Sequence, residues 1–442
     1  MNQTLLLLTV SLCLFSCDSP TEIEDIVVIG GGLMGSSTGW ELSKNGEKVL
    51  LIEQQDSNYT YGSSFGEARI SRSLGPQNDI FSFLQQTSVA KTKELIKYLN
   101  TSENGQSHTM EDIYRTSPVT YVRYASQEEE VHALLDKQED TYEYAPDSKS
   151  AQEIFGMKIP DSIVVIREYK QYSGTLNPKV LIQKLHQGIS YAGNSILYNE
   201  KVTSLKKKND LFEIQIENTK TGKLRTILSK KVAAAAGPYN GELTQEIAPY
   251  IQEVITPKRL FLAFLKIDPT VYGRLTSEQK ERIKTSYPMA DFNSEIFYSM
   301  IENYDEKGMP ILKVGGHFLR TDIEDLDEVW HQELDQQEIE WSKENTLGYL
   351  KMLDLPLRYE DLRYVRGYSC VYSLTASEVP YVTHVITKDM DVDSSFVLLG
   401  GMSGIGAKGS LAYGAIASNL LLNKTDTSAM YQRTVAALGT DR

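Results

Sequence analysis

Three glycines and one acid near the start of the chain have the types and spacing of a dinucleotide site. Gly30, Gly32 and Gly35 form the pattern G-x-G-x-x-G directly after the apolar run 26–29, and Glu53 ends the next apolar run. In this motif the glycines allow a tight turn, close approach of the backbone to a pyrophosphate and close helix packing, while the acid binds ribose hydroxyls. The pattern predicts a bound dinucleotide but does not separate NAD from FAD.

Two arginines follow, and fixed cations of this kind bind anions. Arg69 and Arg72 lie three residues apart in the glycine- and serine-rich stretch 61–72, which is the spacing of one helical face. They would neutralise a phosphate or a carboxylate close to the dinucleotide. A pair of surface arginines is the alternative, and composition alone favours it.

A single lysine stands inside an apolar strand pattern. Lys313 belongs to the expected strand 311–314, and alternation puts it on the face opposite Leu312 and Val314. A lysine in such a strand usually faces solvent. Lys313 therefore matters for chemistry only if its face meets the cofactor.

The cysteine count singles out one thiol. Of the three cysteines, Cys13 and Cys17 lie in the N-terminal segment, so Cys370 is the only cysteine of the remaining chain. A disulfide within that remaining chain is therefore excluded. A lone buried cysteine is commonly an inert apolar residue.

A second glycine-rich stretch lies near the C-terminus. Residues 400–409 follow the expected strand 396–399 and directly precede the expected helix 410–422. Backbone N–H groups at such a junction favour an anion. The stretch lacks the pattern G-x-x-x-x-G-K-[ST], so it is not a phosphate-binding loop of that kind.

The elements that must position these residues alternate between strand and helix, which predicts an α/β fold. Strands are expected at 26–29, 49–52, 195–205, 211–217 and 231–237, and helices at 36–44, 80–99 and 178–192. Strands at 257–266, 296–301 and 311–314 predict a second sheet, which the helical, acidic stretch 326–353 would cover. Between about 111 and 159 a different pattern, of short β-rich pieces and acidic helices, indicates an insertion outside the nucleotide fold.

Length and composition set further bounds. A chain of 442 residues predicts two domains, and 41% hydrophobic with 24% charged residues is typical of a soluble globular protein. The formal net charge of −14 argues against nucleic acid and against an anionic membrane surface as partners. An acidic, solvated surface is sufficient to explain this charge.

The first residues are typical of an export signal. Residues 5–15 form an apolar run that is too short to cross a bilayer but suits the core of a signal peptide, and it ends in a lipoprotein-like processing box at Cys17. No Lys or Arg precedes Lys44, so the usual basic segment is missing. We expect an exported protein with a lipid anchor on Cys17; a cytoplasmic protein is the alternative.

Together these motifs resemble the monomeric sarcosine oxidase and N-methyltryptophan oxidase group of the D-amino-acid-oxidase-like flavoproteins. The resemblance runs from residue 26 to about residue 422 and rests on four stretches in the family's order: GSSFGEARISR, ILKVGGH, CVYS and GMSGIGAKG. It implies a Rossmann-like FAD-binding domain and a second, antiparallel-sheet substrate domain, in an α/β chain that is α+β overall.

The resemblance implies FAD rather than NAD, and it assigns roles to residues. The implied cofactor contacts are Gly30, Gly32, Gly35, Glu53, Arg69, Val202, Gly237, Cys370, Gly404 and Lys408, with Cys370 joined covalently to the flavin. Lys313 would lie above the flavin, where its charge favours reduction of O₂, and His317 would be a pocket histidine. Arg72 and Lys408 would bind the substrate carboxylate. The implied site contains no metal.

The activity implied is oxidation of an amino acid with a secondary amine to an imine, with O₂ reduced to H₂O₂, by a monomer. Four positions depart from the family, because Ser64 and Phe65 replace two histidines, Ala68 replaces a threonine and Ile405 replaces a histidine. These changes make the pocket more apolar, which favours a cyclic or larger N-substituted amino acid over sarcosine. The alternatives are a dehydrogenase or demethylase that passes electrons to a carrier, and a non-catalytic FAD-binding protein.

The expected domain boundaries follow from the same patterns. Residues 1–22 form the leader. The FAD-binding domain takes 23–110, 163–250 and 361–425, and the substrate domain takes 111–162 and 251–360.

Overall fold

The computed structural model describes residues 23–74, 78–101, 107–135, 141–291, 295–330 and 332–439. The expected leader and its lipid anchor at Cys17 lie outside these residues and stay a prediction. Within the described ranges no helix combines the length and the apolar character that a membrane span needs.

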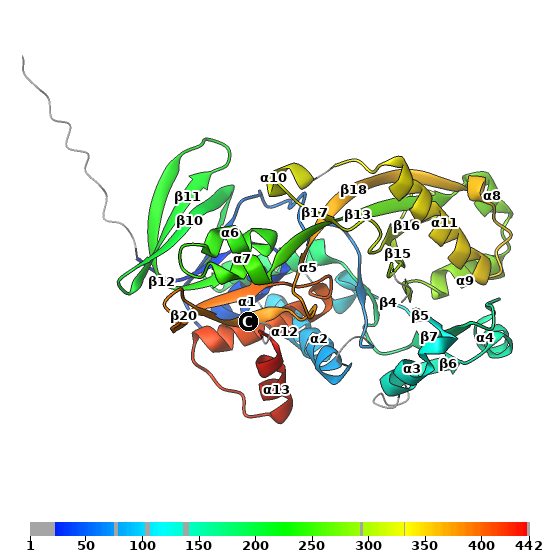
Figure 1. The fold of residues 1–442 in the computed structure, drawn as a ribbon, viewed down its shortest axis with the longest axis horizontal. Coiled ribbons are helices and arrows are strands. Elements are labelled where there is room, and N and C mark those ends of the chain that lie inside the picture. Colours follow the sequence, from blue (N-terminus) through cyan, green and yellow to red (C-terminus); the bar gives the residue numbers. More distant parts are fainter. Residues whose placement is uncertain are drawn as a thin grey trace, which may run out of the picture.

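The first sheet has eight strands. They are β1 (Ile23–Ile29), β2 (Val49–Glu53), β9 (Ser195–Tyr198), β10 (Glu200–Lys208), β11 (Leu211–Asn218), β12 (Leu224–Ala234), β19 (Tyr381–Ile386) and β20 (Val392–Gly400). Its parallel part has the order β9-β2-β1-β12-β20, with β19 antiparallel at the edge of β20. The hairpin β10–β11 pairs with the first half of β12 and projects at the left of Figure 1. This is the Rossmann-like sheet that the glycine motif predicts.

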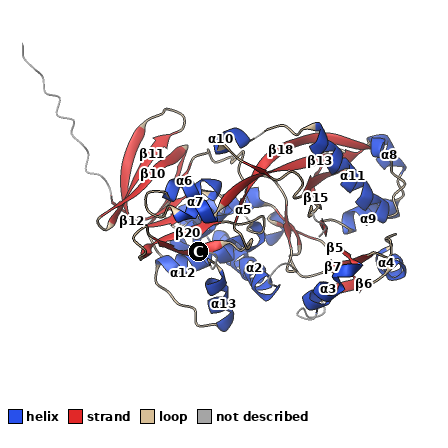
Figure 2. Ribbon diagram, viewed as in Figure 1, coloured by secondary structure: helices blue, strands red, loops and turns tan. Residues whose placement is uncertain are grey.

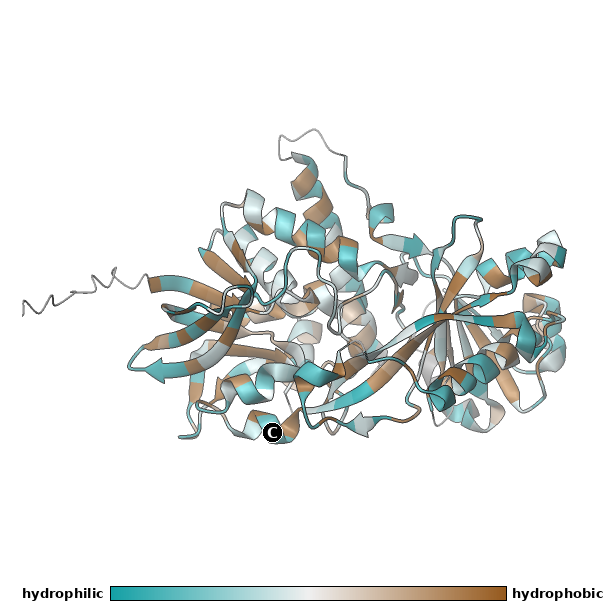
Figure 3. Ribbon diagram, turned by 90° about the horizontal axis from the view of Figure 1, so that it is seen from above, coloured by the Kyte–Doolittle hydropathy of each residue, from teal (hydrophilic) through white to brown (hydrophobic). Residues whose placement is uncertain are grey.

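Alternate residues of β1 enter two different cores because the sheet is covered on both faces. Ile26 and Val28 pack with the helices α1 (Leu33–Lys44), α2 (Asn78–Thr101), α5 (Pro178–Tyr191) and α12 (Ser410–Leu421). Val27 and Ile29 pack with the hairpin β10–β11 and with α7 (Tyr250–Val254), which follows α6 (Asn240–Thr244). In Figure 3 brown, hydrophobic residues follow the strands of both sheets, and the covering helices show teal as well.

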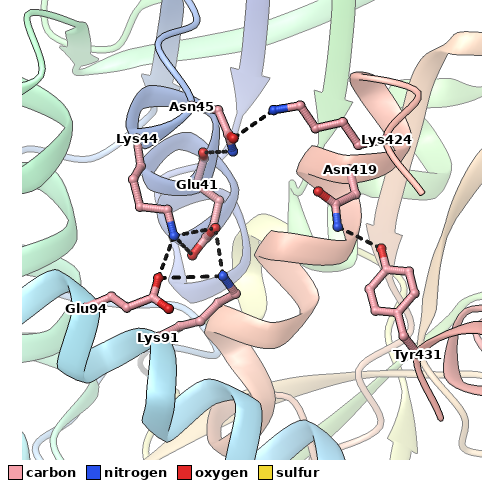
Figure 4. A network of polar contacts seen from close by, with 8 residues as sticks. All are labelled: Glu41, Lys44, Asn45, Lys91, Glu94, Asn419, Lys424 and Tyr431. Atoms are coloured by element: carbon pink, nitrogen blue, oxygen red, sulfur yellow. Dashed lines mark hydrogen bonds and ion pairs between the residues drawn. The ribbon is translucent and has the colours of Figure 1, made fainter. Parts of the chain in front are cut away.

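Polar contacts hold α1 against its neighbours on the outer side. Glu41 lies 3.1 Å from both Lys44 and Lys91, and Lys44 lies 2.7 Å from Glu94, so α1 and α2 share one ion-pair network (Figure 4). The same figure shows contacts around α12 and α13 (Ala429–Ala437): Lys424 with Asn45, and Tyr431 with Asn419. Glu41 is buried and its two lysine partners are partly exposed, so the network joins α1 to α2 and fixes the direction of α1, whose first turn follows the glycine motif.

The second sheet has nine strands. They are β5 (Val119–Tyr124), β6 (Tyr142–Ala145), β7 (Ile163–Glu168), β13 (Thr256–Ile267), β14 (Met289–Asp291), β15 (Tyr298–Tyr304), β16 (Pro310–Gly315), β17 (Thr321–Asp322) and β18 (Leu362–Leu374). The order is β17-β13-β16-β15-β14-β5-β7-β6, and β18 also pairs with β13. All pairs are antiparallel except β14 with β5. The long strands β13 and β18 run side by side across the molecule in Figures 1 and 2.

Helices cover one face of the second sheet. A core of apolar residues joins its strands to α4 (Ser148–Phe155), α8 (Pro269–Arg274), α9 (Ser277–Thr285) and α11 (Gln336–Met352). Near β5 and β7, α3 (Glu128–Leu135) packs on the opposite face. A small third sheet of β3 (Arg69–Ser71), β8 (Gly174–Leu176) and β4 (Tyr114–Thr116) holds the arginine-bearing stretch.

The predicted fold class is confirmed, but some details differ. The strands β7 and β18 belong to the second sheet, so the boundaries predicted at 163 and 361 are wrong for these two strands. β7 pairs with β5 over its full length, and β18 pairs with β13 from Leu362 to Leu374. The rest of the domain division stays a prediction.

The covering stretch 326–353 is broken into two helices. Trp330 is extended after α10 (Leu326–Val329), and its indole N–H donates to Tyr239 Oη at 2.8 Å. A new helix, α11, starts after Asp335, whose side chain forms a capping box with Glu338. A cap of this type marks a helix start inside a sequence that otherwise shows one helical pattern.

Candidate active site

A cavity of about 1670 Å³ lies between the carboxyl ends of the first sheet's parallel strands and the open face of the second sheet. Ligands of doubly wound sheets bind at these strand ends. The cavity brings together nearly all predicted site residues: Gly30, Gly32, Glu53, Arg69, Arg72, Val202, Gly237, Lys313, His317, Cys370, Gly404 and Lys408. Gly35 lies just behind the lining, and its role in cofactor binding, like the others, stays a prediction.

The glycine turn has the close packing that its motif requires. Gly30 has φ +100°, and a Cβ there would lie 2.5 Å from the carbonyl oxygen of Ala235. A Cβ on Gly35 would overlap the carbonyl oxygen of Gly30, so the helix start and the strand end touch through backbone alone. The cavity wall here is bare backbone at the start of α1, which fits a pyrophosphate.

Glu53 ends β2 beside this turn. Its carboxylate accepts the N–H of Gly31 at 2.6 Å and the N–H of Gln55 at 2.8 Å. Burial raises the pKa of Glu53, and these backbone donors oppose the rise. The carboxylate is thus fixed at the cavity wall, in the position where an acid binds ribose hydroxyls.

A chain of three polar side chains, two of them buried, supports the turn from behind. Ser36 Oγ donates to Gly31 O at 2.7 Å and lies 2.8 Å from His186 Nε2, while Tyr198 Oη lies 2.8 Å from His186 Nδ1. Burial lowers the pKa of His186 to about 4. Sequence motifs gave no signal for His186, because its partners come from α1 and β9.

Lys313 faces the cavity side of β16, while Leu312 and Val314 enter the helix-covered core, as alternation predicted. It is not exposed to solvent as lysines in strands usually are, since its side chain is 1% exposed. Lys313 Nζ donates to Glu302 Oε2 and to the carbonyl oxygen of Ala68, each at 3.0 Å. Burial and Arg69 lower the pKa of Lys313 to about 8, against the opposing effect of Glu302.

Cys370 lies on the cavity face of β18 and is the only free cysteine among the described residues. Burial raises the pKa of its thiol to about 11, while Arg69 and Lys313 act in the opposite direction. Tyr372 lies two residues further along the same strand. Its Oη lies 3.2 Å from Tyr298 Oη, and Gly404 packs against its ring. Cys370 is therefore part of the cavity wall, on the strand that also carries Tyr372.

Arg72 and Lys408 converge on one aromatic ring. The guanidinium carbon of Arg72 lies 5.3 Å from the centre of the Phe81 ring, and Lys408 Nζ lies 4.8 Å from it. Burial and the charge of Arg72 lower the pKa of Lys408 well below its usual value. A carboxylate between these two cations would relieve their repulsion, so the pair suits an acidic ligand.

Arg69 differs from its neighbour in what it contacts. Its guanidinium donates to the carbonyl oxygens of Ser63 at 3.0 Å, Phe65 at 2.5 Å and Ala68 at 2.9 Å. These are groups of its own loop, and Ser63 Oγ in turn donates to Val371 O at 2.7 Å. Arg69 thus shapes the loop that carries Ala68 and connects it to the strand of the candidate thiol.

His317 lies at the rim with Arg320. Arg320 Nη2 lies 2.8 Å from both ring nitrogens, and the ring stands edge-on to Tyr372. Burial and Arg320 lower the pKa of His317 to about 4, so the imidazole is neutral at physiological pH. Sequence reasoning found His317 but missed Arg320, three residues later.

Comparison with known proteins agrees with this geometry. Residues 25–420 match the model of the DAO family, described as FAD dependent oxidoreductase, so the chain belongs to this family. It is an FAD-dependent oxidoreductase of the kind that acts on CH–NH groups, as the motifs predicted.

Individual relatives are distant. A probable sarcosine oxidase of Arabidopsis thaliana is 24% identical over 406 residues, covering 90% of this chain and 88% of the relative. The monomeric sarcosine oxidase of Bacillus sp. (strain NS-129) is 23% identical over 399 residues, covering 90% of this chain and 92% of the relative. Both matches span nearly the whole of the relative, so the recognised sarcosine-oxidase-like group is confirmed.

Solved structures share the fold at low identity. NikD, an unusual amino acid oxidase essential for nikkomycin biosynthesis, has a TM-score of 0.69 at 18% identity, covering 94% of this chain and 97% of that one. L-proline dehydrogenase from P. horikoshii has a TM-score of 0.67 at 18% identity, with 95% and 100% covered. Oxidases and a dehydrogenase thus share this architecture.

Proposed function

We propose that the protein oxidises a secondary, N-methyl or cyclic amino acid to its imine and reduces O₂ to H₂O₂. The observation that supports this most is that Arg72 and Lys408, which converge on Phe81, line the same cavity as Cys370 and Lys313. When bound, FAD supplies the acceptor for the hydride on the carbon beside nitrogen, and its two electrons then pass to O₂. An acyclic imine takes up water and splits into an amine and a carbonyl product, whereas a cyclic imine takes up water and opens to one molecule that carries both groups.

The residues present fit FAD. The backbone turn at Gly30 and Gly32 would receive the pyrophosphate, and Glu53 would bind ribose. Val202 and Gly237, both in the cavity lining, would contact the adenosine half. We also propose that Cys370 joins the flavin through Sγ.

The cavity selects the protonation state of the amine. A protonated amine cannot release hydride, so the substrate must be bound with neutral nitrogen. The fixed charge of Arg72, which already lowers the pKa of Lys408, disfavours a further positive charge in this part of the cavity. His317, neutral at physiological pH, adds no charge to the cavity.

Apolar residues narrow the substrate class. Ile405 and Met402 line the cavity on the glycine-rich loop, and Leu262 lines it from β13. This apolar lining favours a ring or a larger N-substituent over the methyl group of sarcosine.

Peroxide formation tests the proposal. Purified protein in air should form one H₂O₂ per amine oxidised with at least one member of a panel of N-methyl and cyclic amino acids. Flavin bleached by an amine without air but not recoloured by O₂ would instead show the alternative, a dehydrogenase that uses a carrier. The ion pair between Lys313 and Glu302 favours that alternative, because a carboxylate 3.0 Å from the ammonium offsets its charge. Flavin that no amine bleaches would support the non-catalytic alternative.

Arg72→Ala and Lys408→Ala should each raise KM for carboxylated substrates by roughly 10- to 100-fold, because each removes a charge-assisted hydrogen bond worth about 1.5–3 kcal/mol. Steady-state kinetics with one substrate and its analogue lacking the carboxylate provide the measurement and its control. The analogue should lose no affinity in either variant. Equal losses for both compounds would place the carboxylate elsewhere.

A further inference from the structure

Strand β15 contains an irregularity beside the buried lysine. Its ladder with β16 shifts register between Ile301 and Asn303, so Glu302 is the extra residue of a β-bulge. A bulge redirects one side chain and removes backbone groups from the ladder. Here Arg115 donates to the carbonyl oxygens of Ile301 and Glu302, each at 3.1 Å. The bulge is therefore stabilised from the neighbouring small sheet, and it fixes the direction of Glu302.

The two carboxylate oxygens of Glu302 have different partners. Oε2 accepts from Lys313 Nζ at 3.0 Å, and Oε1 accepts the backbone N–H of Glu67 at 2.7 Å. Both charged side chains are 1% exposed. Lys313 Nζ completes a closed arrangement by donating to Ala68 O, one residue beyond Glu67. One carboxylate thus joins the lysine to the loop that begins the arginine-bearing stretch.

We propose that Glu302 is a positioning residue for Lys313, which keeps the amine protonated and holds its Nζ at the cavity wall. The use of this cation in the O₂ step rests on the proposed function, whereas the contact itself does not. A buried ammonium without a counter-charge would lose its proton, because desolvation penalises the charged form. Glu302 offsets that penalty, and the Glu67 N–H prevents the carboxylate from rotating away.

Groups from four elements face Lys313. Arg69 disfavours the ammonium, and Glu302 and Cys370 favour it. The Phe264 ring centre lies 5.8 Å from Nζ, and Arg366 lies over the same ring. Burial raises the pKa of the Cys370 thiol to about 11, so the thiol is uncharged at neutral pH. Glu302 therefore carries the negative charge among the residues that face Lys313. Burial alone would raise the pKa of Glu302, but Lys313, the Glu67 N–H and Arg69 lower it.

Glu302→Gln should change the pH dependence of stability. Folded Lys313 has a pKa of about 8, below that of lysine in an unfolded chain, so the unfolded chain binds more protons between these values. The free energy of unfolding therefore rises with pH across this window. Without the carboxylate the folded pKa falls further, and the rise should begin at least about one pH unit lower, a tenfold change in the ionisation equilibrium.

The measurement is the thermal unfolding midpoint across the neutral and alkaline range, on purified protein with its flavin. Comparing Glu302→Gln with the double variant Glu302→Gln/Lys313→Met isolates the titration of Lys313, since the double variant lacks the amine. In Glu302→Asp, which keeps a carboxylate, the rise should begin at a pH between those of Glu302→Gln and the unmutated protein. Glu67→Gln is the matched control. The side-chain carboxylate of Glu67 accepts from Asn303 at 3.0 Å, so this variant should leave the unfolding curve unchanged.

A second readout concerns the reaction. The pH profile of flavin reoxidation by O₂ should shift downward in Glu302→Gln by the same amount as the unfolding curve. If the rise in the free energy of unfolding begins at the same pH in Glu302→Gln as in the unmutated protein, Glu302 does not govern the proton on Lys313 and the inference is overturned. Failure to find an oxidised amine would overturn the proposed function instead and would leave the unfolding result intact.

Discussion

Cys370→Ala should release essentially all of the flavin into the supernatant after acid precipitation, whereas the unmutated protein should keep it in the pellet. Cys370 Sγ lies in the lining of the cavity that the glycine turn enters, and its strand is fixed by pairing with β13 on one side and by the contact of Ser63 with Val371 O. A non-covalent cofactor leaves an unfolded chain, but a cofactor joined through sulfur stays with it. Intact mass of the denatured protein provides an independent measurement.

Ser373→Ala is the matched control for this prediction. Ser373 lines the same cavity from the same strand, three residues from the thiol, but it cannot form a thioether. Its flavin should stay with the pellet. A yellow supernatant from the unmutated protein would contradict covalent attachment while leaving FAD binding intact.

Lys313→Met should slow reoxidation of the flavin by O₂ by roughly 10²–10³-fold, the usual effect of removing one fixed group that stabilises developing charge. The reason is that O₂ becomes negatively charged as it is reduced, and a cation that is 1% exposed is little screened by solvent. Reduction of the flavin by the amine should change much less, because the negative charge that a hydride brings is spread over the ring system, whereas O₂ gains its charge on two atoms. Rapid mixing of the reduced protein with O₂, and of the oxidised protein with amine, measures the two steps separately.

Lys266→Met is the control for this second prediction. Lys266 lies on the adjacent strand β13 and is 31% exposed, with Asp305 as its ion-pair partner at 3.9 Å. Both of its flavin steps should match the unmutated protein. Equal slowing of the two steps in Lys313→Met would remove the role assigned to this lysine.

Much of the first sheet could be predicted because its signals are local. The glycine motif, the helix after it and Glu53 lie within one short segment, and a single strand–helix–strand unit determines their geometry. Strand alternation likewise put Lys313 on the correct face of β16. The four family-like stretches then assigned seven positions, all of which line the cavity.

The residues that were missed depend on pairing between distant segments. Glu302 contacts Lys313 only because a bulge interrupts β15, and no local pattern announces the bulge. Phe81 was part of an expected amphipathic helix, but the two cations that meet it come from positions 72 and 408. The same reason explains the boundary error at β18, whose sequence reads as a strand but does not say which sheet it joins.

The three side chains behind the glycine turn have a further consequence, because their protons can point in only one direction. Ser36 gives its hydrogen to Gly31, so its oxygen must receive one from His186 Nε2, and His186 Nδ1 must receive one from Tyr198. This arrangement requires the tautomer with hydrogen on Nε2. The low basicity of the buried ring prevents a second hydrogen from arriving, which would leave Tyr198 facing a donor. The glycine loop that would bind the pyrophosphate is thus supported by a chain of hydrogen bonds in which every donor points the same way. The chain begins at Tyr198 on β9, the edge strand of the parallel part of the sheet.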